Sequence, residues 1–172
     1  MRLPNPVREI RTVSKLLTGA EAEANKMGET LPGAEHLLLS ALALPDGSAR
    51  RAFERLGADP DELRSAIAGQ YDAALRAIGI EPVSDDALDA EAGAGVTSAK
   101  FAFRLTASAQ TVFRAAVDLA KLERPSRLIG AHVVAAVARM EHGTAARALR
   151  AMRVDRHELA VAAQQELEAR RA

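Results

Sequence analysis

The chain repeats one pattern twice in the same register, and each copy is roughly 60 residues long. Equivalent residues stand 96 positions apart, so that His36 corresponds to His132 and Leu63 to Leu159. The other matching pairs include Gly47 with Gly143, Arg51 with Arg147, Asp59 with Asp155, and Glu62 with Glu158. Two copies indicate a tandem duplication rather than a long array. We therefore expect the copies to pack against each other as one closed unit.

The local pattern is helical in both copies. From Asn5, a favourable N-cap followed by Pro6, apolar residues recur at helical spacing until Gly28. The further predicted helices cover about 34–42, 49–56, 60–78, 107–123, 131–141, 144–152 and 156–170. No segment alternates apolar and polar residues, so we expect no strand. The predicted fold is all-α, with eight helices as two pseudo-symmetric four-helix repeats.

Several residues are placed to begin these helices. Ser48 is expected to cap the third helix, and Thr106 to cap the first helix of the second copy. Asp59, with Glu62 three residues later, forms the pattern of a capping box, and Asp155 begins the same pattern in the second copy. These positions set the expected starts of four helices.

We predict one domain over residues 1–172, divided into two repeats. Repeat 1 is expected at 5–79 and repeat 2 at 101–170. Residues 80–100 are acidic, small and interrupted by Pro and Gly, which is typical of a mobile linker.

The composition argues against several classes of protein. Basic and acidic residues both number 23, so no net charge draws the chain to nucleic acid or to an anionic membrane. Aromatic residues make up only 3%, which leaves few platforms for stacking bases. Without Cys, disulfides and thiolate metal sites are excluded. With neither a leader nor a long apolar run, we expect a cytoplasmic protein that binds neither nucleic acid nor membrane.

No catalytic pattern stands out in the chain. There is no Gly-x-Ser-x-Gly elbow, no His-Glu-x-x-His motif and no Gly-x-x-x-x-Gly-Lys-Ser/Thr loop for nucleotide phosphates. His36 and His132 stand beside apolar residues without further metal ligands nearby, so we expect packed histidines that are hydrogen-bonded to the backbone. His142 and His157 are expected to be exposed. We predict that the chain is not an enzyme and needs no metal or cofactor.

The repeated segment carries a recognisable motif. The first copy reads Pro32-Gly33-Ala34-Glu35-His36-Leu37-Leu38-Leu39, then Pro45-Asp46-Gly47, then Phe53-Glu54-Arg55-Leu56-Gly57-Ala58-Asp59. This pattern resembles the Clp N-terminal repeat family, the double four-helix module in front of AAA+ unfoldases of the ClpA and ClpC type. In the second copy Ala131 replaces the glutamate, and Arg153 replaces the glycine that is expected to end a helix.

The resemblance implies a non-catalytic protein-binding module related to the Clp proteolytic system. Such a module, free of a motor of its own, would engage substrates, adaptors or Clp subunits as an accessory receptor or a decoy. The family's binding surfaces correspond to Glu35, His36, Leu105 and Thr106, which are the candidate ligand-binding residues. Leu105 stands where the family often has Phe.

In the ClpC branch, the motif glutamate and a threonine at the start of the repeat's first helix lie at a pocket for phosphorylated arginine. By position, the first repeat keeps Glu35 but has Ile10 at the threonine position. The second keeps Thr106 but has Ala131 opposite Glu35, so neither pocket is expected to be complete. Phosphoarginine binding is one hypothesis; the alternative is that Glu35 only stabilises the positive end of its helix.

Two alternatives concern the arginines. Arginine clusters occur at Arg50, Arg51 and Arg55, and at Arg147, Arg150, Arg153 and Arg156. They form either a solvated face or a docking site for an acidic partner. A helical DNA-binding regulator is the alternative function, since short helix pairs imitate helix-turn-helix spacing, although the charge balance argues against it.

Overall fold

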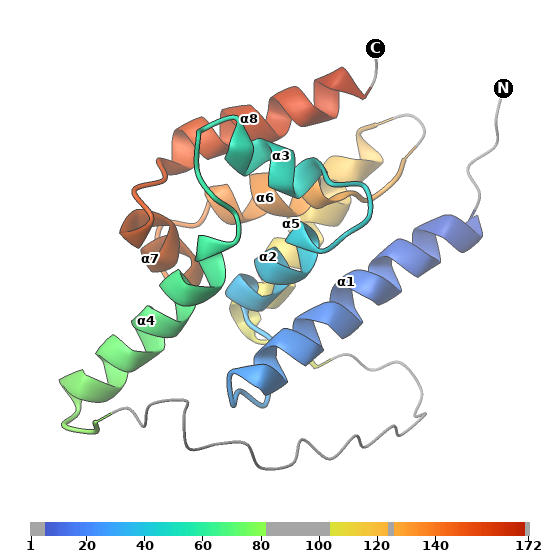
Figure 1. Cartoon of the computed structure of the whole chain (residues 1–172). Coiled ribbons are helices and arrows are strands. Elements are labelled where there is room, and N and C mark those ends of the chain that lie inside the picture. The colour runs from blue at the N-terminus through green and yellow to red at the C-terminus, as the bar shows by residue number, and fades with distance from the viewer. Residues whose placement is uncertain (1–5, 82–103, 124–125, 171–172) are drawn as a thin grey trace, which may run out of the picture.

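The described part of the chain consists of eight α-helices (Figure 1). It comprises residues 6–81, 104–123 and 126–170 of this computed structural model. The helices are α1 (Pro6–Lys26), α2 (Ala34–Leu42), α3 (Ser48–Glu54), α4 (Glu62–Ala77), α5 (Ala107–Lys121), α6 (Gly130–Ala138), α7 (Thr144–Ala151) and α8 (Arg156–Ala169). No strand occurs in these residues, which confirms the predicted all-α fold. The repeat boundaries stay predictions; Asn5 and residues 82–100 of the expected linker lie outside the described residues.

Two short helices, α2 and α6, form the centre of the molecule. Every residue of both helices is buried, as their sequences, apolar on nearly all sides, require. Helix α1 packs along α2 and α5 packs along α6, and the two central helices also contact each other. The core is built mainly from Leu, Val and Ala, and Phe53 is its largest fully buried side chain.

The two halves of the chain interlock. Helix α4 from the first half packs against α7 from the second, and α8 from the second half packs against α3 from the first. Gly130, at the start of α6, lies where a Cβ atom would be 2.8 Å from the Cβ of Ala49 and 3.1 Å from the carbonyl oxygen of Ala41. This close approach needs glycine, because a side chain at position 130 would separate the halves.

Helix α4 breaks the resemblance between the halves. It projects from the body at the lower left of Figure 1, whereas α8 also packs along α6. Its buried residues, Leu63 and Ile67, both lie in the first half of the helix, and Ile78 just beyond its end is 72% exposed. The fully buried residues of α4 therefore lie only in its first half, and Tyr71 further along the helix packs against the core while partly buried.

Two of the four predicted helix caps are confirmed. The Thr106 side chain accepts a hydrogen bond from the N–H of Ala109, and Asp155 accepts from His157 and Glu158. The prediction that Ser48 caps α3 is wrong, because Ser48 is the first residue of that helix and its hydroxyl accepts the N–H of Ala131 instead.

The predicted start of α4 at Asp59 and Pro60 is also wrong. The helix begins at Glu62, and Asp59 accepts a hydrogen bond from the N–H of Asp61 at 2.9 Å. The Asp59 carboxylate, which the sequence pattern assigned to the helix cap, therefore closes a short turn before the helix.

Candidate functional site

A buried histidine organises the start of α2. The Nδ1 atom of His36 accepts a hydrogen bond from the N–H of Gly33 at 2.9 Å, and the side chain is fully buried. In the second half, His132 accepts the N–H of Ile129 at 3.1 Å in the same way. Burial lowers the pKa of both histidines, against the attraction of nearby glutamates. The prediction of packed histidines bound to the backbone is confirmed.

Glu35 folds back over the loop that precedes α2. A Cβ atom on Gly33 would lie 2.3 Å from Oε1 of Glu35, so the carboxylate occupies the space that a side chain at position 33 would need. Glu35 is 8% exposed, and its Oε1 accepts a hydrogen bond from the hydroxyl of Tyr71 at 2.7 Å. The glycine and the glutamate of the motif are thus a sterically matched pair.

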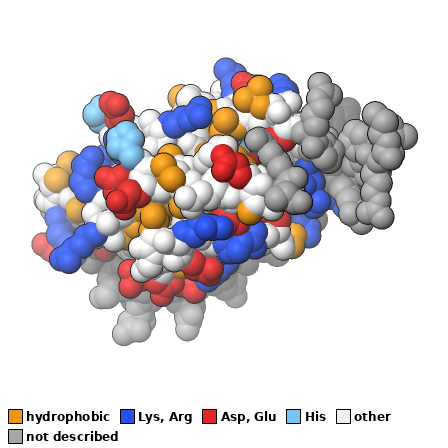
Figure 2. Space-filling model, turned by 90° about the horizontal axis from the view of Figure 1, so that it is seen from above, with side chains coloured by type: hydrophobic (Ala, Val, Ile, Leu, Met, Phe, Trp, Pro, Cys, Tyr) orange, Lys and Arg blue, Asp and Glu red, His pale blue; other side chains and the backbone are white. Residues whose placement is uncertain are grey.

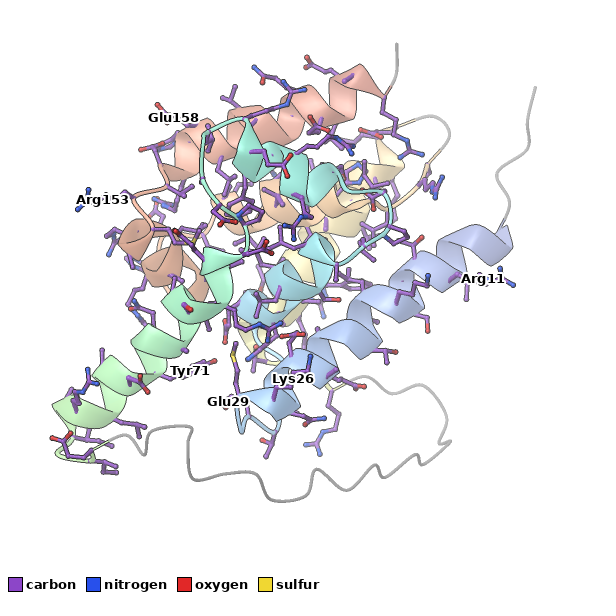
Figure 3. The ribbon with its side chains drawn as sticks, viewed as in Figure 1. Arg11, Lys26, Glu29, Tyr71, Arg153 and Glu158 are labelled. Atoms are coloured by element: carbon purple, nitrogen blue, oxygen red, sulfur yellow. The ribbon has the colours of Figure 1, made fainter. Side chains whose placement is uncertain are left out.

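Tyr71 completes this cluster, although the sequence pattern did not single it out. It lies on α4 and points toward the side of the molecule where α1 ends (Figure 3). Its ring stacks on His36 with 6.4 Å between the ring centroids. Burial, reinforced by the bond to Glu35, raises the pKa of Tyr71, so the phenol stays protonated and donates. As the chain's single tyrosine, it offered a signal only by its rarity.

Thr106 lies against the same loop, although it belongs to the second half of the chain. Its backbone N–H donates to the carbonyl oxygen of Pro32 at 3.1 Å. Thr106 and Glu35 therefore contact two adjacent residues of one loop, Pro32 and Gly33 respectively. The structure groups the retained glutamate of one half with the retained threonine of the other, which differs from the pairing expected within each repeat.

Chain geometry explains this grouping. Helix α5 has 15 residues and is therefore about 22 Å long, and Thr106 stands at its beginning. Helix α6 follows the other end of α5, so Ala131 near its start is remote from Thr106 along α5. Leu105, the fourth candidate residue, is half-buried and packs against the core.

The start of α6 has a different arrangement, because Ala131 supplies no carboxylate. Both carboxylate oxygens of Asp46 lie 3.3 Å from the N–H of Gly130, and the Ser48 hydroxyl accepts the N–H of Ala131 at 2.8 Å. The first half of the chain thus provides the negative charge that favours this helix end.

The first arginine cluster pairs with carboxylates of the chain itself. Arg51 and Arg55 each donate through Nε to Glu166 at 2.6 Å, and Arg50 makes two bonds of 2.9 Å to Asp61. Burial alone would raise the pKa of Glu166, but the two arginine bonds outweigh it and lower the pKa. This cluster is therefore partly structural, which the sequence left open.

The described ranges contain no group of three or more His, Asp or Glu side chains that could hold a metal ion. None of the helices within them has the length and apolar character needed to cross a bilayer. His142 and His157 are exposed, as expected. Figure 2 looks down on the side of α8 and shows basic and acidic side chains interspersed rather than one field of a single sign.

Comparisons with known proteins point to one family. A family model described as the Clp repeat (R) N-terminal domain matches residues 11–92. The chain is 36% identical over 78 residues to a chloroplastic ClpA homologue, CD4B, of Solanum lycopersicum, and 34% identical over 86 residues to the chloroplastic chaperone ClpC of Pisum sativum. These matches cover 45% and 50% of this chain, but only 7% and 8% of the relatives.

A solved structure matches the whole fold. The N-terminal domain of the chaperone ClpD from Arabidopsis thaliana superposes with a TM-score of 0.59 at 20% identity, over 91% of this chain and 92% of that domain. At this identity the match shows a shared fold. The sequence relatives are chloroplastic, so the cytoplasmic location stays a prediction.

Proposed function

We propose that this chain is a member of the Clp N-terminal domain family and a non-catalytic protein-binding module that engages substrates or adaptors of the Clp proteolytic system, because residues 11–92 match the Clp repeat model and the fold matches the ClpD N-terminal domain. The site is the start of α2, where Thr106 contacts Pro32 and Glu35 contacts Gly33 of the same loop. One observation supports the proposal above the rest: the hydrogen bond between the N–H of Thr106 and the carbonyl oxygen of Pro32, which brings Thr106 to the loop that Glu35 covers.

The chemistry of this site suits a protein that carries phosphorylated arginine. Tyr71 holds Oε1 of Glu35, and within the described residues Oε2 accepts no hydrogen bond, so this oxygen is available to a guanidinium N–H. Thr106 begins α5, whose N-terminal end favours a phosphate group. A single ligand with a cationic half and an anionic half suits the Glu35 carboxylate and the N-terminal end of α5.

Calorimetry with free phosphoarginine and with an arginine-phosphorylated protein tests the proposal. Glu35→Gln should weaken binding by at least about tenfold, since a hydrogen bond to a charged group contributes about 1.5–3 kcal/mol. Glu62→Gln, which removes an exposed first-turn glutamate from α4, is the matched control and should bind as the natural chain does.

Unphosphorylated arginine and phosphoserine serve as ligand controls. No binding of phosphoarginine at millimolar concentration, or equal binding by Glu35→Gln, would reject this ligand. Thermal melts of both variants separate a loss of binding from a loss of folded protein.

A further inference from the structure

A cavity lies between α3, the start of α6 and the end of α8, and is separate from the Glu35 site. Its volume is about 380 Å³, which is within the range of small-molecule pockets. Charged side chains line much of it: Arg51, Arg55, Arg127, Arg170, Asp46 and Glu166. Ser48 and two small apolar surfaces, from Ile129 and Ala169, complete the wall.

The charges in this cavity do not balance. Four arginines face two carboxylates, which leaves a formal charge of +2. The first-half site has a glutamate in the first turn of α2, whereas the equivalent residue beside this cavity is Ala131. The site therefore has the opposite preference from the Glu35 site and favours an anion.

Several guanidinium donors remain available for that anion. Glu166 engages Arg51 and Arg55 through their Nε atoms, and one further donor of Arg51 bonds the carbonyl oxygen of Asp46. The side chains of Arg51 and Arg55 are still 52% and 43% exposed. The Nε atom of Arg127 is buried and has no hydrogen-bond acceptor in the part of the chain that the structure describes.

The start of α6 is not the anion-binding element here. Its first two N–H groups already bond Asp46 and Ser48, so a ligand would be held by guanidinium groups. Guanidinium forks recognise phosphate oxygens in pairs. A phosphate monoester carries a charge of about −1.5 to −2 near pH 7, which matches the excess of +2.

We propose that this cavity binds a phosphate monoester, with the phosphate on the arginines and the organic part against Ile129 and Ala169. The phosphate belongs either to a phosphorylated side chain of a protein or to a phosphorylated small molecule. This ligand is independent of phosphoarginine binding at Glu35.

Titration of the full chain, followed by calorimetry and by backbone amide NMR shifts, tests the proposal. The probes are a phosphoserine peptide, a nucleoside monophosphate and inorganic phosphate; the unphosphorylated peptide and the nucleoside are controls. We expect saturable binding of at least one organic phosphate, with shifts at α3, α8 and the start of α6, and weakening as salt rises. A response to the peptide alone identifies a protein source, and a response to the nucleotide alone identifies a small molecule.

Arg127→Gln and Arg170→Gln should each weaken this binding by about tenfold, as loss of a charge-assisted bond predicts. Arg150→Gln removes the same charge from an exposed position on α7 outside the cavity, and Glu35→Gln alters the other site; both should bind normally. If Arg127→Gln unfolds, Arg127→Lys retains the charge and should still lose affinity, because it lacks the fork.

Three results would overturn the proposal. They are the absence of binding by both organic phosphates at millimolar concentration, equal affinity in the cavity variants and the natural chain, and an equal loss in Arg150→Gln, which would indicate only the general charge of the surface.

Discussion

Arg153 and Gly57 adopt the same left-handed backbone conformation, with φ of 58° and 67°, in equivalent turns after α7 and α3. Arg153 is the one non-glycine residue with positive φ among the described residues. The turns close alike: Val154 donates its N–H to Leu149, as Ala58 does to Phe53. Arg153 therefore occupies a backbone position that the first half fills with glycine.

Replacing Arg153 by glycine should stabilise the protein. The left-handed conformation costs a non-glycine residue on the order of 1 kcal/mol. The greater freedom of glycine in the unfolded chain offsets part of that gain, so we expect a net increase of up to about 1 kcal/mol. Figure 3 shows Arg153 pointing outward from the turn, so little packing is lost. The urea midpoint should rise with an unchanged m-value.

Gly57→Ala provides the reciprocal control and should destabilise by about 1 kcal/mol, since it introduces the same strain. Arg153→Ala keeps the strain and should bring no gain. A less stable Arg153→Gly would mean that the arginine makes contacts whose contribution exceeds the strain.

Gly33→Ala should destabilise the protein for a different reason. The φ of Gly33 is −93°, which any residue adopts, so the penalty comes from the Cβ atom 2.3 Å from Oε1 of Glu35. The carboxylate must move and lose its bond to Tyr71. We expect a loss of about 1–3 kcal/mol in the free energy of unfolding, measured by denaturant titration.

The double variant Gly33→Ala/Glu35→Ala distinguishes this steric cause from a general intolerance of the loop. Removing the carboxylate frees the space, so the alanine at position 33 should cost less in the Glu35→Ala background than alone. Additive effects at positions 33 and 35 would contradict the steric explanation.

Gly69→Ala should have the opposite sign from Gly33→Ala. Gly69 lies in α4 with nothing within 4 Å of its Cβ position, so alanine should stabilise the protein by roughly 0.5–1 kcal/mol.

The buried histidines predict a loss of stability in mild acid. His36 and His132 have pKa values below the ordinary 6.5 in the folded protein, so between pH 6.5 and the folded pKa the unfolded chain binds more protons. Stability therefore falls as pH drops below about 6.5, by up to about 1.4 kcal/mol per pH unit for each histidine. Urea unfolding at several pH values measures this slope.

Removal of either histidine should reduce the slope. His36→Gln and His132→Gln each eliminate one group whose pKa is lowered by burial, so each variant should lose stability less steeply in acid than the natural chain. If the stability of the natural chain does not change between pH 7 and 5, the folded protein protonates these rings without losing stability, and the prediction is wrong.

The fold could be predicted from the sequence because both copies repeat the residues that begin and end helices. Helix α2 spans the predicted residues, and the helices of the second copy begin within a residue of expectation. The errors lie at Ser48 and Asp59, where side chains that suit helix caps are used elsewhere. Ser48 bonds Ala131 across the interface between the halves, which no local pattern encodes.

Only half of the candidate site could be predicted from the sequence, because its residues come from distant segments of the chain. The motif located Glu35 and Thr106, but the pairing within each repeat assumed that each half builds its own pocket. Thr106 instead bonds Pro32, and Tyr71 joins from α4. Sequence spacing carries no information on such exchange between halves; only the packing of the helices does.

Glu166 links the two halves, and its replacement by Gln should show how much this link contributes. The carboxylate is 5% exposed and accepts bonds from Arg51 and Arg55 on α3, so a neutral amide leaves both arginines with a weaker acceptor. Because those arginines are about half exposed, solvent screens the pair, and we expect a loss of about 1–3 kcal/mol, below that for a fully buried pair.

A double-mutant cycle with Arg51→Gln isolates the interaction in urea unfolding. The two losses should add to more than the loss in the double variant, because each single change removes the same contact. Asp61→Asn, which breaks the exposed pair with Arg50, is the matched control and should have no measurable effect. Strict additivity in the cycle would mean that the ion pair between Arg51 and Glu166 contributes nothing to the free energy of unfolding. The contribution of Glu166 would then come from its packing on α8.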